Sequence, residues 1–307
     1  MSAIVIGVDG GGTQTRVQGA DEDGKVLGSV TAPGSAVRPG AAALSAQVVA
    51  AAVQQVLAEA GIADVTPRVL SVGIAGAGRE ADRDALRRAL LEHELATDLL
   101  VQTDAQVALE DAFGDGPGIL LAAGTGSIAV GRSPAGRSAR AGGFGPVIGD
   151  EGSATWLGHR ALASVCAASD GREPETALTG AVLTYTECDD VQGLVHWAAH
   201  ASRAQFAALA PVVILCAEQG DVRANTLCTL AVEELALHVR ALARELFVDE
   251  RAACPVAFTG GLLGPRAFLR RKLEHRLKGF VPGAQVKSGD VVPVRGAVRA
   301  ALRLIGA

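Results

Sequence analysis

Three observations in the 307-residue sequence predict an α/β fold built from two duplicated domains. Residues 4–17 follow the pattern of a buried strand, a glycine turn and a second strand. The same pattern returns at residues 118–130. Between the two copies, segments with strand and helix periodicity alternate, as expected for a sheet with crossover helices. Chance similarity of two glycine turns is the alternative, but the shared order of strands and turns favours a duplication.

The first glycine turn has the composition of a phosphate site. Asp9 ends an apolar, β-branched segment, and it is followed by three glycines, Gly10–Gly12, and by the hydroxyls of Thr13 and Thr15. Glycines leave backbone N–H groups uncovered, and amides and hydroxyls together suit phosphate oxygens. A carboxylate at the end of a strand suits a hydrated Mg²⁺. The alternative is an ordinary hairpin turn, which seldom needs three glycines beside an acid.

This turn differs from the common phosphate loops. The sequence contains no GxxxxGK[ST] motif, and the glycine run does not open a helix as a dinucleotide fingerprint does. Residues 16–20 continue as a strand, 21–24 form a turn, and 25–30 form a third strand. We therefore expect a β-hairpin, and not a helix N-terminus, to hold the phosphate.

A second acidic residue, Asp104, lies where a ligand is expected. After a loop at 32–40, the pattern predicts helices at 41–60, 80–91 and 105–113 and strands at 68–75 and 99–103. Asp104 follows the last of these strands, and ligands collect at the carboxyl ends of strands in α/β sheets. A carboxylate there can accept the proton of an attacking hydroxyl. Thr103 or Asp104 is the predicted N-cap of the following helix, and the alternative to a catalytic role is that Asp104 only caps that helix.

The second half of the chain repeats the design and extends it. Residues 118–130 contain the second glycine turn, and 137–141 form a further strand. A glycine-rich loop at 142–152 carries Asp150 and Glu151, for one of which helix capping alone is a sufficient explanation. Helices are predicted at 153–168, 225–247, 265–277 and 293–305, strands at 255–258 and 285–287, and mixed helix and loop at 170–225.

Composition excludes several classes of protein. The net charge of −5 argues against nucleic acid or an anionic membrane as the main partner. We see no signal peptide and no apolar run of membrane-spanning length, so a cytoplasmic protein is expected. The five cysteines are widely spaced. This spacing predicts reduced cysteines in the protein core, and neither a set of disulfide bonds nor a zinc site. His196 and His200 have the i, i+4 spacing of metal ligands, but a packed helix face is favoured.

The ordered set of motifs resembles the actin–hexokinase–Hsp70 ATPase superfamily, and within it the N-acetylglucosamine kinase and BadF/BadG/BcrA/BcrD group. The resemblance spans residues 4 to about 264 and rests on the following motifs: Gly7-Val-Asp-Gly-Gly-Gly-Thr-Gln-Thr15, Gly73-Ile-Ala-Gly-Ala-Gly78, Thr103-Asp-Ala105, Gly124-Thr-Gly-Ser127, 142–153 and Thr259-Gly-Gly261. It implies duplicated ribonuclease-H-like (actin-like ATPase) domains with an interdomain cleft. The domains would be 1–113 plus 291–307, and 114–290.

The resemblance also implies roles for individual residues. The base would be Asp104, and Asp9 would face the metal. ATP would be bound by Asp9, Gly11, Gly12, Thr13, Thr15, Gly124, Thr125, Gly126, Ser127, Gly260 and Gly261. The sugar would be bound by Gly76, Asp104, Thr125, Gly143, Phe144, Asp150 and Glu151.

The implied activity is an ATP- and Mg²⁺-dependent kinase acting on the 6-hydroxyl of an amino sugar, with N-acetylglucosamine first. We also expect a homodimer, and neither a nucleic acid nor a membrane partner. Two departures leave glucosamine and N-acetylmuramate open: the loop 34–40 lacks the Asn that the family commonly has, and Phe144 stands where Trp is common. Arg38 is interpreted as a solvated loop residue, with a contact to an acidic sugar as the alternative.

Two other functions exist among similar proteins. An ATP-driven activator of a CoA-ester dehydratase or reductase would need closely placed cysteines for an iron–sulfur cluster, and none of the five lies on a glycine loop. A sugar-sensing regulator would carry a DNA-binding segment before the first strand, where the sequence has only a few residues. A kinase-like protein that only binds its ligands remains an alternative. The basic run Arg266–Lys278 is interpreted as a solvated helix face, or as the source of an Arg against the nucleotide.

Overall fold

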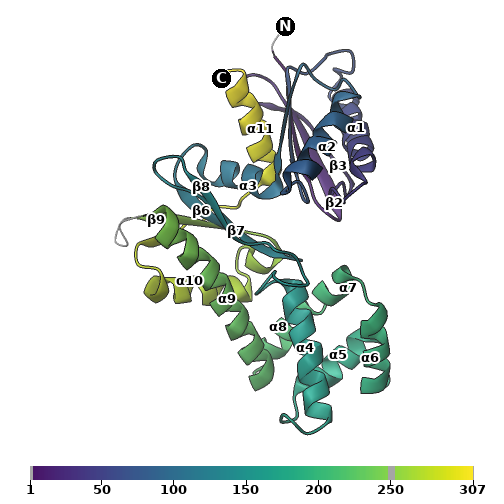
Figure 1. The fold of residues 1–307 in the computed structure, drawn as a ribbon, viewed down its shortest axis with the longest axis vertical. Coiled ribbons are helices and arrows are strands. Elements are labelled where there is room, and N and C mark those ends of the chain that lie inside the picture. The colour runs from purple at the N-terminus through teal and green to yellow at the C-terminus, as the bar shows by residue number, and fades with distance from the viewer. Residues whose placement is uncertain (1–2, 248–252, 307) are drawn as a thin grey trace. The chain divides into compact units, whose positions relative to one another are not determined.

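The computed structural model describes residues 3–247 and 253–306, and its backbone divides into two compact units. The first unit contains residues Met1–Gly116 and Val291–Ala307, and the second contains Pro117–Asp290. Each unit holds one five-stranded sheet with helices packed on it (Figure 1). The last segment of the chain therefore belongs to the same unit as the first.

The sheet of the first unit has the order β3-β2-β1-β4-β5. Its strands are β1 (Val5–Gly10), β2 (Gln14–Ala20), β3 (Val26–Pro33), β4 (Val69–Ile74) and β5 (Asp98–Thr103). The first three form an antiparallel meander, while β4 and β5 run parallel to β1. The carboxyl ends of β1, β4 and β5 therefore lie at one edge of the sheet, with Asp9 and Asp104 beside it.

Helices cover both faces of this sheet. One face packs on α1 (Ala42–Glu59) and α2 (Glu80–Leu91) through a core of branched side chains, among them Ile6, Val53 and Leu86. The other face packs on α3 (Asp104–Phe113) and α11 (Pro293–Leu304), and Figure 1 shows α11 (yellow) beside the first unit's strands. Gly7 of β1 allows this approach, because a Cβ there would lie 2.5 Å from the backbone nitrogen of Val298.

A buried ion-pair cluster fastens α11 to α3. Both carboxylate oxygens of Asp111 accept from Arg295, at 2.5 and 2.7 Å, and Oδ2 also accepts the N–H of Val292 at 2.8 Å. Arg299 donates to the carbonyl of Asp111 at 2.9 Å, and Arg303 pairs with Glu110. Because α3 begins at Asp104, this cluster holds the helix that carries the predicted base.

The second unit repeats the first. Its strands are β6 (Gly118–Ala123), β7 (Ser127–Arg132), β8 (Ser138–Gly142), β9 (Cys254–Thr259) and β10 (Ala284–Val286). The order β8-β7-β6-β9-β10 and the strand directions match those of β3-β2-β1-β4-β5. The matching order and directions confirm the predicted duplication and the actin-like fold class.

The helices of the second unit lie near the predicted ranges, and the region 170–225 consists of helices and loops, as predicted. They are α4 (Ala154–Ser169), α5 (Ala177–Thr186), α6 (Val191–His200), α7 (Arg203–Ala207), α8 (Ala210–Glu218), α9 (Val222–Leu246) and α10 (Phe268–Phe280), with the short 3₁₀ helix η1 (Gly261–Leu263). The prediction that Pro265 opens a helix is wrong. Arg266 has a positive φ of 66°, which is incompatible with a helix, so α10 begins only at Phe268.

The structure also bears on the predicted state of the cysteines and on the expectation that no segment is long enough to span a membrane. All five cysteines are free, and burial raises the pKa of the Cys228 and Cys254 thiols to about 11. One described helix, α1, has the length and composition of a membrane span, contrary to the expectation that no segment reaches this length. Its apolar residues, such as Val49 and Val53, are fully buried against the first unit's sheet, as in an ordinary core helix.

Candidate active site

The first glycine turn is a tight hairpin at the carboxyl end of β1. The N–H of Gly11 donates to the carbonyl of Gln14 at 2.9 Å, which closes the turn. Gly12 and Thr13 are exposed at its tip, so their backbone and hydroxyl groups can reach a ligand. Thr15 is fully buried, and its hydroxyl donates to the carbonyl of Pro33 at 2.7 Å. The Thr15 side chain therefore anchors the hairpin to the neighbouring strand from inside the first unit, and it does not lie on the hairpin's surface.

Asp9 and Asp104 lie at the same edge of the sheet and influence each other. Burial and the nearby carboxylate of Asp104 raise the pKa of Asp9 to about 6, while Arg16 on the paired strand lowers it. Asp104 keeps a solvent-accessible surface, so a ligand can reach it. The protein atoms packed around its carboxylate reduce its hydration and raise its pKa. Hydrogen bonds to the carboxylate, among them one from the N–H of Ala105, lower the pKa and partly offset this shift.

The capping explanation for Asp104 is wrong. Thr103 is the N-cap of α3, and it forms a reciprocal capping box with Gln106. Asp104 is the first residue of the helix, and its Oδ1 accepts the N–H of Ala105 at 3.0 Å. The carboxylate is therefore not required to cap the helix, and it remains available at the strand end.

These pKa shifts predict how activity depends on pH. In their predicted roles of metal-facing acid and base, Asp9 and Asp104 act as ionised carboxylates. Both have raised pKa values, so both become protonated at a higher pH than an ordinary Asp. We expect kcat/KM to rise with pH through about 6, the value for Asp9, and to level off above it. The raised pKa of Asp9 also affects stability. Between pH 3.8 and about 6 the folded protein binds more protons at Asp9 than the unfolded protein does, so the contribution of Asp9 to the free energy of unfolding falls as the pH rises through this range. A pH–rate profile that is flat between pH 5 and 7 would contradict the assignment.

The loop after β3 joins the hairpin to the end of β4. The carbonyl of Gly11 accepts the N–H groups of Ser35 and Ala36, both at 3.1 Å, and Val37 donates to the carbonyl of Ala75 at 2.8 Å. Gly76 must be glycine, since its φ is +88° and a Cβ would lie 2.1 Å from the carbonyl oxygen of Val37. Gly76, predicted to bind the sugar, thus lies at the same sheet edge as Asp9 and Asp104.

The second glycine turn is fastened to the N-terminus of α4. The N–H of Ala154 donates to the carbonyl of Gly124 at 2.9 Å, and the hydroxyl of Thr155 donates to the carbonyl of Thr125 at 2.6 Å. Thr125 is exposed, whereas Ser127 is buried and donates its hydroxyl to the carbonyl of Glu151 at 2.7 Å. The helix end therefore holds the hairpin's carbonyls, which leaves hairpin amides for a ligand.

Asp150 does not cap α4, because Ser153 fills that position and accepts the N–H of Trp156 at 3.2 Å. The buried carboxylate of Asp150 lies beneath the second hairpin and faces the N–H of Ser127 at 3.4 Å. Its other oxygen accepts from Arg203 at 2.6 Å. Burial raises the pKa of Asp150, and Arg203 opposes that shift. Nothing in the sequence pattern pointed to Arg203, which lies 53 positions further along the chain.

Gly260 and Gly261 lie directly beside the second hairpin. The strands β6 and β9 are parallel neighbours, and a Cβ on Gly124 would be 3.7 Å from the nitrogen of Gly261. Gly260 has a φ of +92°, and a Cβ there would be 2.4 Å from the carbonyl of Ala123. The two turns, predicted separately to bind phosphate and adenosine, therefore share one edge of this sheet.

The basic run after this turn is only partly a solvated helix face. Arg270 is buried, where it pairs with Glu274 at 2.7 Å and donates to the carbonyls of Leu263 and Lys287. A groove of about 410 Å³ adjoins it, lined in part by Arg266 and Lys278. The prediction of a solvated face is thus wrong for Arg270, and a cation does lie against the loop that follows Gly261.

The loop of residues 142–152 presents apolar side chains to solvent. Phe144 is 61% exposed, and Val147 and Ile148 are exposed further, at 92% and 77%. The guanidinium of Arg140 lies 5.1 Å from the centre of the Phe144 ring, which orients it. The base of the loop is packed tightly, since a Cβ on Gly143 would be 2.7 Å from the side chain of Ile128. An accessible aromatic ring on a fixed base suits the predicted contact with a sugar.

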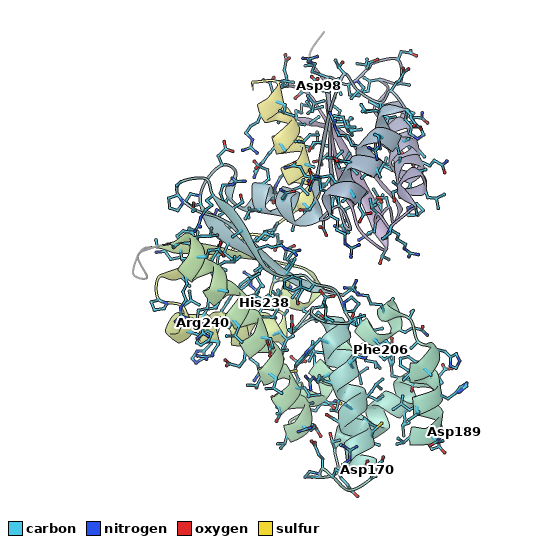
Figure 2. All side chains as sticks on the ribbon, viewed as in Figure 1. Asp98, Asp170, Asp189, Phe206, His238 and Arg240 are labelled. Atoms are coloured by element: carbon cyan, nitrogen blue, oxygen red, sulfur yellow. The ribbon has the colours of Figure 1, made fainter. Side chains whose placement is uncertain are left out.

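Glu151, also predicted to bind the sugar, is partly buried and faces His238 at 3.8 Å. Figure 2 labels His238 on α9. His196 and His200 lie side by side on α6 with ring centres 4.7 Å apart and ring planes tilted by 47°, and Nδ1 of His200 contacts the carbonyl of His196. Across residues 3–247 and 253–306, no group of three His, Cys, Asp or Glu side chains forms a potential metal cage.

Comparison with known proteins agrees with this geometry. Residues 6–303 match the model of the BadF/BadG/BcrA/BcrD ATPase family. The chain is 29% identical to the N-acetyl-D-glucosamine kinase of Dictyostelium discoideum, over 97% of this chain and 98% of that protein. It is also 29% identical to the N-acetylmuramic acid/N-acetylglucosamine kinase of Clostridium acetobutylicum, over 80% of this chain and 81% of that protein.

A solved structure of similar sequence also shares the fold of this chain. A protein of Chromobacterium violaceum, described as a candidate N-acetylglucosamine kinase, superposes with a TM-score of 0.81 at 33% identity, and covers 98% of this chain and 99% of that one. The predicted family resemblance is confirmed, and the relatives found by sequence are sugar kinases.

Proposed function

Because this chain belongs to the BadF/BadG/BcrA/BcrD ATPase family, we propose that it is an ATP-dependent kinase that phosphorylates the 6-hydroxyl of an amino sugar, with N-acetylglucosamine as its substrate. The observation that carries the proposal is the accessible carboxylate of Asp104, with its raised pKa, at the same sheet edge as Asp9 and the first glycine hairpin. The similarity to named N-acetylglucosamine kinases over nearly the whole chain supports the choice of substrate.

In the proposed reaction Asp104 accepts the proton of the sugar's 6-hydroxyl. A bond forms between O6 and the γ-phosphorus of ATP, the bond from that phosphorus to the β–γ bridging oxygen breaks, and ADP leaves. Because burial raises the pKa of Asp104, its carboxylate is a better proton acceptor than that of an ordinary Asp. Such a base contributes typically 10²–10⁴-fold in rate.

Backbone amides and one acid would bind the phosphates of ATP. We assign this role to the exposed residues of the two hairpins, Gly12 and Thr13 in one and Thr125 in the other, with Gly11, Gly124 and Gly126 completing the turns. Asp9 fits a magnesium ion, since Mg²⁺ is usually held by one or two carboxylates together with substrate phosphates and needs no all-protein cage. Bound Mg²⁺ would neutralise phosphate charge. Gly260 and Gly261 would contact the adenosine.

Glucosamine and N-acetylmuramate are the alternative substrates within this reaction class. The Clostridium acetobutylicum relative is named for N-acetylmuramic acid as well as N-acetylglucosamine. N-acetylmuramate, the larger and acidic sugar, is therefore an alternative substrate for this chain. We propose as sugar contacts Gly76, Gly143, Phe144, Asp150 and Glu151. We also propose a cytoplasmic homodimer.

A coupled assay of ADP release tests the proposal. Hexoses, hexosamines, N-acetylhexosamines and N-acetylmuramate are each supplied with ATP and Mg²⁺ at neutral pH. We expect the highest kcat/KM for N-acetylglucosamine. Highest activity on glucosamine or N-acetylmuramate would correct the substrate and keep the chemistry. No ADP release above the ATP-only control with any sugar would refute the kinase assignment in favour of a protein that only binds its ligands.

A further inference from the structure

The ion pair between Arg203 and Asp150 lies against the tip of the second glycine hairpin. One guanidinium nitrogen of Arg203, Nη2, is 2.6 Å from Oδ2 of Asp150. A Cβ on Gly126 would lie 2.4 Å from this nitrogen and 2.9 Å from the same carboxylate oxygen. A side chain at Gly126 would have to displace the ends of both side chains, so the ion pair lies directly against the hairpin.

The pair is asymmetric in burial. The Asp150 side chain is 6% exposed, whereas that of Arg203 is 45% exposed. Asp150 also takes a φ of +58°, which L residues other than glycine, Asn and Asp rarely adopt, and this conformation directs its carboxylate beneath the hairpin. A buried carboxylate without a partner is strongly unfavourable, and Arg203 is the charged partner that opposes the burial-induced rise in the pKa of Asp150.

Packing on α4 fixes the position of Arg203. Arg203 is the first residue of α7, and Ser202 before it forms a capping box with Gln205. Phe206 of α7 stacks on His159 of α4 with ring centres 4.0 Å apart, and Figure 2 shows Phe206 beside α4. Gly158 permits the contact, since a Cβ there would be 2.1 Å from the carbonyl of Phe206. The guanidinium therefore reaches the hairpin from a fixed helix.

We propose that Arg203 is a positioning residue for nucleotide binding: through Asp150 it holds the second hairpin, Gly124–Ser127, in the shape that binds the phosphates of ATP. The chain of contacts is Arg203 to Asp150, Asp150 to the N–H of Ser127, and Arg203 against Gly126. This inference rests on the proposed function, because it assumes that the hairpin binds ATP. It assigns no contact between Arg203 and the sugar.

The test measures MgATP affinity by calorimetry on the full chain, without sugar. In Arg203→Gln we expect the Kd for MgATP to rise roughly tenfold or more, as when a binding group is displaced by about an ångström. In turnover assays the KM for ATP should rise more than kcat falls and more than the KM for the sugar rises. Arg203→Lys, which can still reach one carboxylate oxygen, should recover most of the affinity.

Arg172→Gln is the matched control. Arg172 forms an ion pair of the same chemistry with Asp170, at 2.8 Å and well exposed, on the loop after α4. Its removal should leave the Kd for MgATP unchanged. Equal MgATP affinity in wild type and Arg203→Gln would overturn the inference alone, as would an Arg203→Lys variant that folds but binds no better than Arg203→Gln. A wild-type protein that binds no MgATP would overturn this inference together with the proposed function.

Discussion

Replacing Asp104 with Asn is expected to lower kcat by about 10²–10⁴-fold while MgATP still binds with nearly unchanged affinity. The amide oxygen can accept the N–H of Ala105 as the carboxylate does, and the capping box of Thr103 and Gln106 remains, so α3 should keep its start. What is lost is the acceptor for the hydroxyl proton. Steady-state kinetics together with calorimetric titration of MgATP measure both effects.

Asp98→Asn is the matched control for this substitution. Asp98, labelled in Figure 2, begins the strand that ends before Asp104. It pairs with Arg68 at 3.2 Å, with both side chains about half exposed. An exposed pair of this kind contributes little to stability, so kcat should stay near the wild-type value. If Asp104→Asn retained wild-type kcat, Asp104 would be removed as the base.

Replacing Asp111 with Ala is expected to destabilise the first unit by about 3 kcal/mol. The buried carboxylate of Asp111 receives two hydrogen bonds from Arg295 and one from the N–H of Val292, which together dock α11 onto α3. Because Arg295 is itself about half exposed, water can solvate it after the change, which keeps the loss at the lower end for a broken buried pair. Urea unfolding followed by circular dichroism measures the difference.

Asp115→Ala provides the comparison on the same helix pair. Asp115 pairs with Arg303, but its side chain is 78% exposed, so we expect a change of at most about 1 kcal/mol. An equally small change in Asp111→Ala would show that apolar packing alone, such as Val298 against β1, holds α11 in place.

The regular elements and the glycine turns could be predicted from the sequence because they depend on local chemistry. Strand periodicity located β1, β4 and β5 to within about a residue, and it placed Asp9 and Asp104 at strand ends. The repeated glycine turn revealed the duplication, which the identical strand orders confirm. Family motifs added roles that no periodicity implies.

What the sequence did not reveal depends on contacts between distant segments. The partner of Asp150 is 53 residues away on a five-residue helix, and no local pattern joins the two. The burial of Thr15 and Arg270 follows from neighbours supplied by other elements, Pro33 in one case and Leu263 and Lys287 in the other. The delayed start of α10 comes from the left-handed backbone of Arg266, which residue propensity does not predict.

The central claim is that phosphate is transferred from ATP to the 6-hydroxyl of an amino sugar. Phosphorus–proton correlation NMR of the products formed from ATP, Mg²⁺ and N-acetylglucosamine tests it most directly. We predict a phosphomonoester signal coupled to the two protons on carbon 6, appearing in step with ADP. Phosphate coupled to the proton on carbon 1, or only ADP and free phosphate with unchanged sugar, would contradict the account.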